Sequence, residues 1–125
     1  MQNTSALQVT DEESKAVQKT PNRVALADIE AAIAHEFTFN MGEAALCLDP
    51  HVALKGPLPA CAESLGVLTV CTLVMRNGFT VIGKSAPADA ANYNADLGRK
   101  FAREDAIRQL WPLMGFALRD RLMAS

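Results

Sequence analysis

The chain has 125 residues, a formal net charge of −2, and apolar residues at half of its positions. This length fits one domain with its own core, and a near-neutral charge argues against a protein whose main partner is duplex nucleic acid. The three cysteines have irregular spacings, the N-terminus lacks a secretory signal pattern, and no apolar run reaches bilayer length. We therefore expect a cytoplasmic protein with no membrane partner.

The first 18 residues are polar and acidic, without a sustained apolar period, and they predict a disordered arm. Residues 19–125 are then expected to form a single α+β domain. Its first element is predicted to be a short helix with Asp28 in the first turn, where a carboxylate complements the helix dipole. The apolar stripe of this helix is expected at Val24, Ile29, Ile33 and Phe37, which have helical spacing.

The segment from Phe37 to Leu65 is interrupted by Pro50, Pro57 and Pro59. Each proline biases the residue before it away from helix. We predict an irregular loop here, with no more than a helical turn.

The strongest local signal is an antiparallel β-hairpin over residues 67–84 that turns at Asn77-Gly78. Asn-Gly between two apolar runs is typical of a two-residue type I′ turn. That turn predicts Met75 opposite Thr80, Val74 opposite Val81 and Leu73 opposite Ile82. Gly83 within the second strand suggests that something approaches the strand backbone closely there.

In this register both faces of the hairpin are apolar. One helix can cover only one face, and unpaired strand edges favour association. We expect either the middle segment or another subunit to cover the second face, and we predict a homo-oligomer.

A long helix is predicted over residues 95–123, with Asn94 as its N-cap. Gly98, Ala102 and Ala106 recur every four residues and form a narrow groove that admits another backbone. Pro112 removes a backbone donor, so we expect either a kink there or two helices.

No catalytic or metal-binding pattern stands out. His35, Cys47, His51 and Cys61 lack the spacing of zinc ligands and are interpreted as isolated side chains. The pair Cys47 and His51 is interpreted in the same way, and no nucleophile elbow or phosphate-binding glycine loop is present. We expect no enzyme activity, no cofactor and no metal.

Arg99 and Arg103 share one side of the last helix, and forked guanidinium groups suit phosphate. Aromatic and amide side chains nearby in the sequence would hold a base or ribose; they are Tyr93, Phe79, Asn77, Asn92 and Asn94. The alternative is a solvated helix face on which Glu104 and Asp105 pair with the arginines.

Three runs resemble a family of small tailed-phage proteins of the gene 49 / gene 66 type. They are Leu68–Ser85 with Asn-Gly-Phe-Thr-Val, Asn92–Ala106 with Leu-Gly-Arg, and Leu110–Arg119 with Trp-Pro-Leu-Met-Gly; the opening Thr20–Glu30 also resembles the family. The hairpin followed by a long helix is similar to the phage anti-defence sponges that act against the Thoeris system. The resemblance spans about residues 20–122.

The resemblance to the sponges implies a homo-oligomer, with hexamers known, that binds a cyclic or ADP-ribose-type immune signalling nucleotide without cleaving it. It implies a place in the cytoplasm of the infected host cell. Arg99 and Arg103 would bind phosphate, with Asn77, Phe79, Tyr93 and Asn92 completing the ligand site. The alternatives are a protein–protein interaction module that uses the apolar hairpin face, and a single-stranded nucleic-acid binder on the arginine face.

Overall fold

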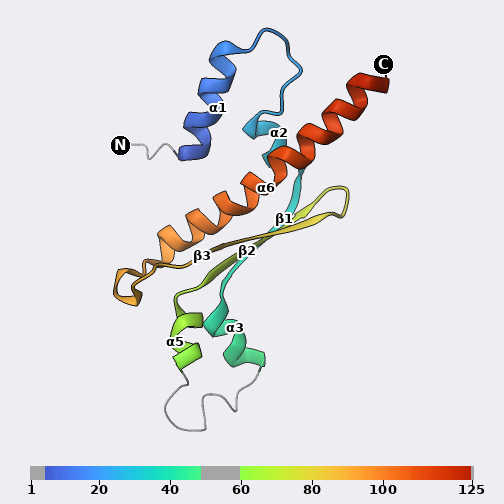
Figure 1. Cartoon of the computed structure of the whole chain (residues 1–125). Helices are drawn as coiled ribbons and strands as arrows, with labels where there is room; N and C mark the ends of the chain where they lie inside the picture. The colour runs from blue at the N-terminus through green and yellow to red at the C-terminus, as the bar shows by residue number, and fades with distance from the viewer. Residues whose placement is uncertain (1–4, 49–59, 125) are drawn as a thin grey trace.

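A computed structural model describes residues 5–48 and 60–124. The described part is an α+β fold with a three-stranded antiparallel sheet in the order β1-β2-β3. The long helix α6 runs along one face of this sheet, α3 and α5 lie beyond one end of the strands, and the β2–β3 turn lies at the other end (Figure 1). The elements are α1 (Ala6–Val17), α2 (Leu26–Ala32), β1 (Ile33–Asn40), α3 (Met41–Leu48), α5 (Ala60–Gly66), β2 (Thr69–Met75), β3 (Thr80–Ser85), the 3-10 helix η1 (Ala90–Asn92) and α6 (Ala95–Ala124).

The predicted disordered arm over residues 1–18 is wrong for Ala6–Val17, which form α1. Ser5 begins this helix with a capping box, because its hydroxyl accepts from the Gln8 N–H while the Gln8 side chain accepts from the Ser5 N–H. Leu7 is buried in the main core cluster. Leu7, the N-cap and the bonds from Arg23 and the Leu26 N–H to Asp11 therefore hold a segment whose composition suggested an arm. That residues 19–125 form a single domain stays a prediction.

The predicted helical stripe from Val24 to Phe37 is wrong beyond Ala32, where the chain turns into β1. Residues 33–40 are rich in β-branched and aromatic side chains, which favour strands. The alternation of His35, Phe37 and Phe39 is the period-two signal that the helical spacing of Ile33 and Phe37 obscured. Pairing with β2 gives this segment a full ladder of backbone hydrogen bonds.

The turn between β2 and β3 is one residue longer than predicted. Met75 donates to the Phe79 carbonyl (2.7 Å) and Gly78 donates to the Met75 carbonyl (2.9 Å), which leaves a loop of Arg76, Asn77 and Gly78. Gly78 alone takes a positive φ, of 90°, among the described residues. The Asn77 side chain accepts from the Phe79 N–H, so Asn77 stabilises the loop without adopting the left-handed conformation that a type I′ turn requires.

The longer loop shifts the predicted register by one residue. Leu73 lies opposite Val81 and Val74 lies opposite Thr80. Because a shift of one moves side chains to the other face, Val81 joins Leu73 toward α6 and Ile82 turns to the open face. The open face, which we define as the sheet face away from α6, also carries Phe37 and Phe39 from β1.

The middle segment is more regular than predicted, because Phe37–Asn40 belong to β1 and helices α3 and α5 follow. Residues 49–59, which include Pro50, Pro57 and Pro59, lie outside the described part. The 3-10 helix η1 follows β3. The predicted N-cap of the last helix is confirmed, because the Asn94 side chain accepts from the Leu97 N–H (3.0 Å).

Helix α6 continues through Pro112 as a single element, so the alternative of two helices is wrong. It lies unusually close to β3. A Cβ added at Gly83 would be 2.1 Å from the Ala102 carbonyl oxygen and 2.4 Å from the Ala106 nitrogen. The close approach expected at Gly83 is therefore made by α6, at the small residues Ala102 and Ala106 of the predicted groove.

We expect Gly83→Ala to destabilise the fold by about 1–3 kcal/mol, because the new methyl group would displace the α6 backbone from the sheet. Gly115→Ala is the matched control: nothing lies within 4 Å of its added Cβ, and the change favours helix by up to about 1 kcal/mol. Urea unfolding followed by circular dichroism measures both. A Gly83→Ala protein as stable as wild type would contradict this packing.

Asp11 couples α1 to α2 in a pH-dependent way. Burial raises the pKa of its carboxyl group, but the hydrogen bonds from Arg23 (2.8 Å) and from the Leu26 N–H (3.0 Å) outweigh burial, and the pKa is lowered overall. The resulting stabilisation is present above the unfolded-state pKa and is lost as pH falls through the folded-state pKa.

We expect Asp11→Asn to lower the free energy of unfolding by about 1–2 kcal/mol at pH 7. The difference from wild type should start to shrink as the pH falls below the ordinary carboxyl pKa of about 4, and should continue to shrink as the pH falls through the lowered pKa of the folded Asp11 carboxyl group. Urea titrations at a series of pH values measure this difference. A difference that does not change with pH would show that the charge of Asp11 is not involved.

Candidate functional site

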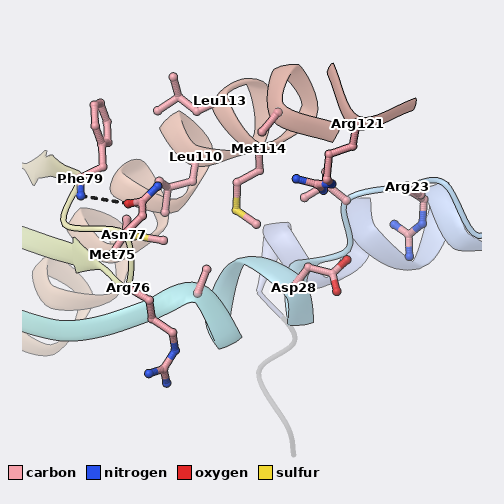
Figure 2. A pocket seen from close by; sticks show the side chains of 13 residues that line it. Arg23, Asp28, Met75, Arg76, Asn77, Phe79, Leu110, Leu113, Met114 and Arg121 are labelled. Carbon is pink, nitrogen blue, oxygen red and sulfur yellow. Dashed lines mark hydrogen bonds between the residues drawn. The ribbon is translucent and has the colours of Figure 1, made fainter. Parts of the chain in front are cut away.

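A concavity lies between the β2–β3 turn, α2 and the C-terminal half of α6. Its volume is about 630 Å³, which is within the range of small-molecule pockets. Phe79 and Asn77 lie at one end and Arg121 and Asp28 lie toward the other, with Met114 between them (Figure 2). We call this concavity the tip pocket; its lining residues are Arg23, Val24, Asp28, Ala32, Met75, Arg76, Asn77, Phe79, Leu110, Leu113, Met114, Ala117 and Arg121.

The walls of the tip pocket carry three arginines and one carboxylate, Asp28. Arg23 forms an ion pair with Asp11 at 2.8 Å, so its position is fixed from outside the pocket. Arg76 extends away from Phe79 (Figure 2), and its Nε donates to the Ala31 carbonyl at 2.7 Å. The Arg76 side chain thus satisfies a carbonyl at the C-terminal end of α2. Arg121, from α6, lines the pocket on the side toward Arg23 (Figure 2).

Asp28, toward the end of the pocket away from Phe79, has a structural role (Figure 2). Its Oδ2 accepts from the Ala25 N–H at 2.8 Å and so begins α2.

The six predicted ligand residues lie in three places. Asn77 and Phe79 line the tip pocket. Asn92 and Tyr93 line a smaller concavity of about 220 Å³ near the start of α6. Arg99 and Arg103 lie on the side of α6 and line neither of these two concavities. Within one described protomer, the six residues therefore do not converge on a single site.

Tyr93 has a structural contact as well: the Asn40 side-chain amide donates to its hydroxyl oxygen at 3.2 Å and to the Gly66 carbonyl at 2.7 Å. These bonds join the end of β1, the end of α5 and the segment before α6. Phe101 and Leu97, both substantially exposed, form the outer wall of the same small concavity.

Arg103 is held by carboxylates from two other elements. Its Nε lies 2.6 Å from Glu36 of β1, and its Nη1 lies 3.6 Å from Glu30 of α2. Burial lowers the pKa of this guanidinium, but the hydrogen bond and charge of Glu36, aided by Glu30, raise it overall. Arg99 pairs with Asp96 on the solvent side of α6.

The predicted solvated pairing of Glu104 and Asp105 with these two arginines is wrong. Glu104 is 6% exposed and lies 3.5 Å from Arg108. Asp105 accepts from the backbone N–H of Lys84 in β3 at 2.9 Å. The sequence signal that could have indicated this is the i, i+4 spacing of Glu104 and Arg108.

Residues considered for metal or thiol chemistry remain separate. Cys47 is exposed and Cys71 is buried, and burial raises the pKa of the Cys71 thiol. In residues 5–48 and 60–124 there is no cluster of three or more His, Cys, Asp or Glu side chains that could hold a metal ion. His51 lies outside these ranges. None of the helices described is both long and apolar enough to cross a bilayer.

We expect Arg103→Ala to lower the free energy of unfolding by about 0.5–1 kcal/mol, since the Glu36 pair is partly shielded from water. Arg99→Ala should change it by less than about 0.3 kcal/mol, because the pair with Asp96 is exposed on both sides. A double-mutant cycle of Arg103 with Glu36, measured by urea unfolding, isolates the pair energy. Zero coupling would show that the pair of Arg103 with Glu36 does not stabilise the fold.

Comparison with known proteins identifies a family. The model of the phage protein (N4 Gp49/phage Sf6 gene 66) family matches residues 24–122. This range runs from the chain before α2 to near the end of α6, so it includes the sheet and the lining of the tip pocket except Arg23. No curated protein and no solved structure matches the chain significantly. The chain belongs to the phage N4 Gp49/phage Sf6 gene 66 family.

Proposed function

We propose that this phage protein is a sponge: it binds a cyclic or ADP-ribose-type signalling nucleotide and sequesters it without cleaving it, in the cytoplasm of the infected host cell. The observation that carries the proposal is the tip pocket, which combines an aromatic ring, an amide and three arginines around an apolar floor. These are the groups that stack on a base, bond to a sugar or base edge, and hold phosphate.

The composition of the pocket wall favours holding over cleaving. The described lining includes no cysteine, serine, threonine or histidine, and its carboxylate is engaged at the start of α2. The described lining of this wall offers no thiol, hydroxyl or imidazole as a nucleophile but has donors for an anion. Sequestration requires affinity and abundance alone.

In this proposal, Arg99 and Arg103 form the second half of a ligand site that is shared between two copies of the chain. They lie away from Phe79 within a protomer, so they would meet a ligand held at the tip of another copy. A homo-oligomer, as in the sponges, supplies such a neighbour, and the many exposed large apolar side chains support self-association. To bind a phosphate group, Arg103 would have to give up its ion pair with Glu36.

The proposal is tested by calorimetry with cyclic dinucleotides, cyclic trinucleotides, cyclic ADP-ribose isomers and linear ADP-ribose. We expect at least one of these ligands to bind and, after heat release, to be recovered intact by chromatography. Phe79→Ala and Arg121→Ala should each weaken binding about tenfold or more, whereas Arg119→Ala on the exposed side of α6 should not.

The outcomes separate the possibilities. Loss of binding in Arg99→Ala with unchanged Phe79→Ala would move the site to the side of α6. Recovery of a cleaved product would make the protein an enzyme. If none of the four ligand classes binds, the sponge proposal is wrong.

A second candidate function is a protein–protein interaction module on the open face of the sheet. The exposure of Phe37, Phe39 and Ile82 on that face supports it, because contiguous exposed apolar side chains are typical of protein contact sites. This function predicts a protein that binds a host or phage protein and has no nucleotide affinity.

A further inference from the structure

The two edges of the sheet differ in how their backbone groups are used. At the β3 edge, Asp105 accepts from the Lys84 N–H (2.9 Å) and the Gln109 side chain donates to the Ile82 carbonyl (2.7 Å). Both side chains come from α6. Together they occupy outward-facing groups of β3 that an added strand would need, which is a common way of blocking a sheet edge.

The β1 edge has no such cover from the described elements. Met75 bonds toward β3, so by alternation Val74, Thr72 and Val70 bond toward β1. Their partners in β1 are His35, Phe37 and Phe39. The N–H and C=O groups of the intervening residues Glu36 and Thr38 therefore point outward from the sheet, and no bond from another described element reaches them.

We infer that two copies of the chain pair through β1, antiparallel and about a two-fold axis at Phe37, to form one continuous six-stranded sheet. In this register Glu36 of one copy and Thr38 of the other exchange backbone hydrogen bonds on both sides of the axis. Phe37 faces the same residue of the partner at a non-hydrogen-bonded position, where opposing side chains approach most closely.

The sequence of β1 is self-complementary in this register. On the open face, His35 lies opposite Phe39 of the second copy and Phe37 lies opposite its own equivalent. On the other face, Ala34 lies opposite Asn40 and Glu36 lies opposite Thr38. Aromatic cross-strand pairs are stabilising, and no like charges oppose each other.

Neighbouring registers are less favourable. Antiparallel pairing through the outward groups permits the axis to move only in whole-residue steps. An axis at Glu36 would place two carboxylates face to face, which is destabilising. An axis at Thr38 would shorten the paired segment, because β1 ends at Asn40. The axis at Phe37 uses nearly all of the strand and avoids the charge clash.

The exposure of the aromatic residues agrees with this interface. Phe37 is 62% exposed in the isolated protomer although it is central in its strand. Ile82 on β3 has a similar exposure of 59% on the same face, but it lies two strands away from the proposed axis. Substitutions at Phe37 and at Ile82 can therefore distinguish pairing at the β1 edge from stacking of two open faces.

The first test is sedimentation equilibrium of the full chain. We expect a mass that is a multiple of two protomers of 13.4 kDa. Phe37→Lys should reduce the assembly to half its size or less, because two lysines would oppose each other at the axis. Ile82→Lys should leave the β1-paired dimer intact. A wild-type monomer, or dissociation to protomers by Ile82→Lys with Phe37→Lys unaffected, would overturn the proposal.

The second test does not depend on disrupting the fold. Phe37→Cys in a Cys47→Ser, Cys61→Ser background should form a covalent dimer under mild oxidation, because residues opposed at a non-hydrogen-bonded position have the Cα separation of a disulfide. Ile82→Cys in the same background is the matched control and should stay uncrosslinked. Crosslinking of Ile82→Cys but not Phe37→Cys would show that the open faces, and not the β1 edges, meet. The result is independent of whether any nucleotide binds.

Discussion

The close approach of α6 to the sheet determines most of the other contacts in this fold. With glycine at position 83, the backbone of α6 at Ala102 and Ala106 lies directly against β3. At that short distance α6 side chains reach groups that they would otherwise miss. Asp105 and Gln109 reach the edge of β3, and Arg103 reaches Glu36 at the opposite strand. The same approach places Leu110 and Met114 behind the β2–β3 turn, where they form the floor of the tip pocket.

The elements that could be predicted are those whose signals are local. Asn94 as an N-cap, the repeated small residues at positions 98, 102 and 106, and Gly83 as a site of close approach each follow from the chemistry of one or a few residues. Strand β1 could not be separated from a helix on spacing alone, because Ile33 and Phe37 satisfy both periods. The predicted register of the hairpin was wrong for a related reason. Asn-Gly fits both a two-residue and a three-residue turn, and the hydrogen bond of the Asn77 side chain favours the three-residue turn.

The grouping of the candidate site residues could not be predicted from the sequence. Residue types suited to a nucleotide were identified, but their grouping requires the fold. Phe79 and Asn77 share a pocket with Arg121, a residue 42 positions after Phe79 in the chain that no motif indicated. Conversely, Arg103 shares a helix side with Arg99, yet Glu30 and Glu36, which are distant in sequence, engage it. Charge pairing across a fold cannot be deduced from one helix face.

The blocked edge of β3 also sets a limit on how large an ordered sheet of this protein can become. A strand-pairing surface on both edges would give each copy two neighbours and permit growth into a fibre. Because Asp105 and Gln109 occupy the β3 edge, each copy can pair its backbone with only one other copy. The protein can then reach a high concentration without polymerising through its own sheet.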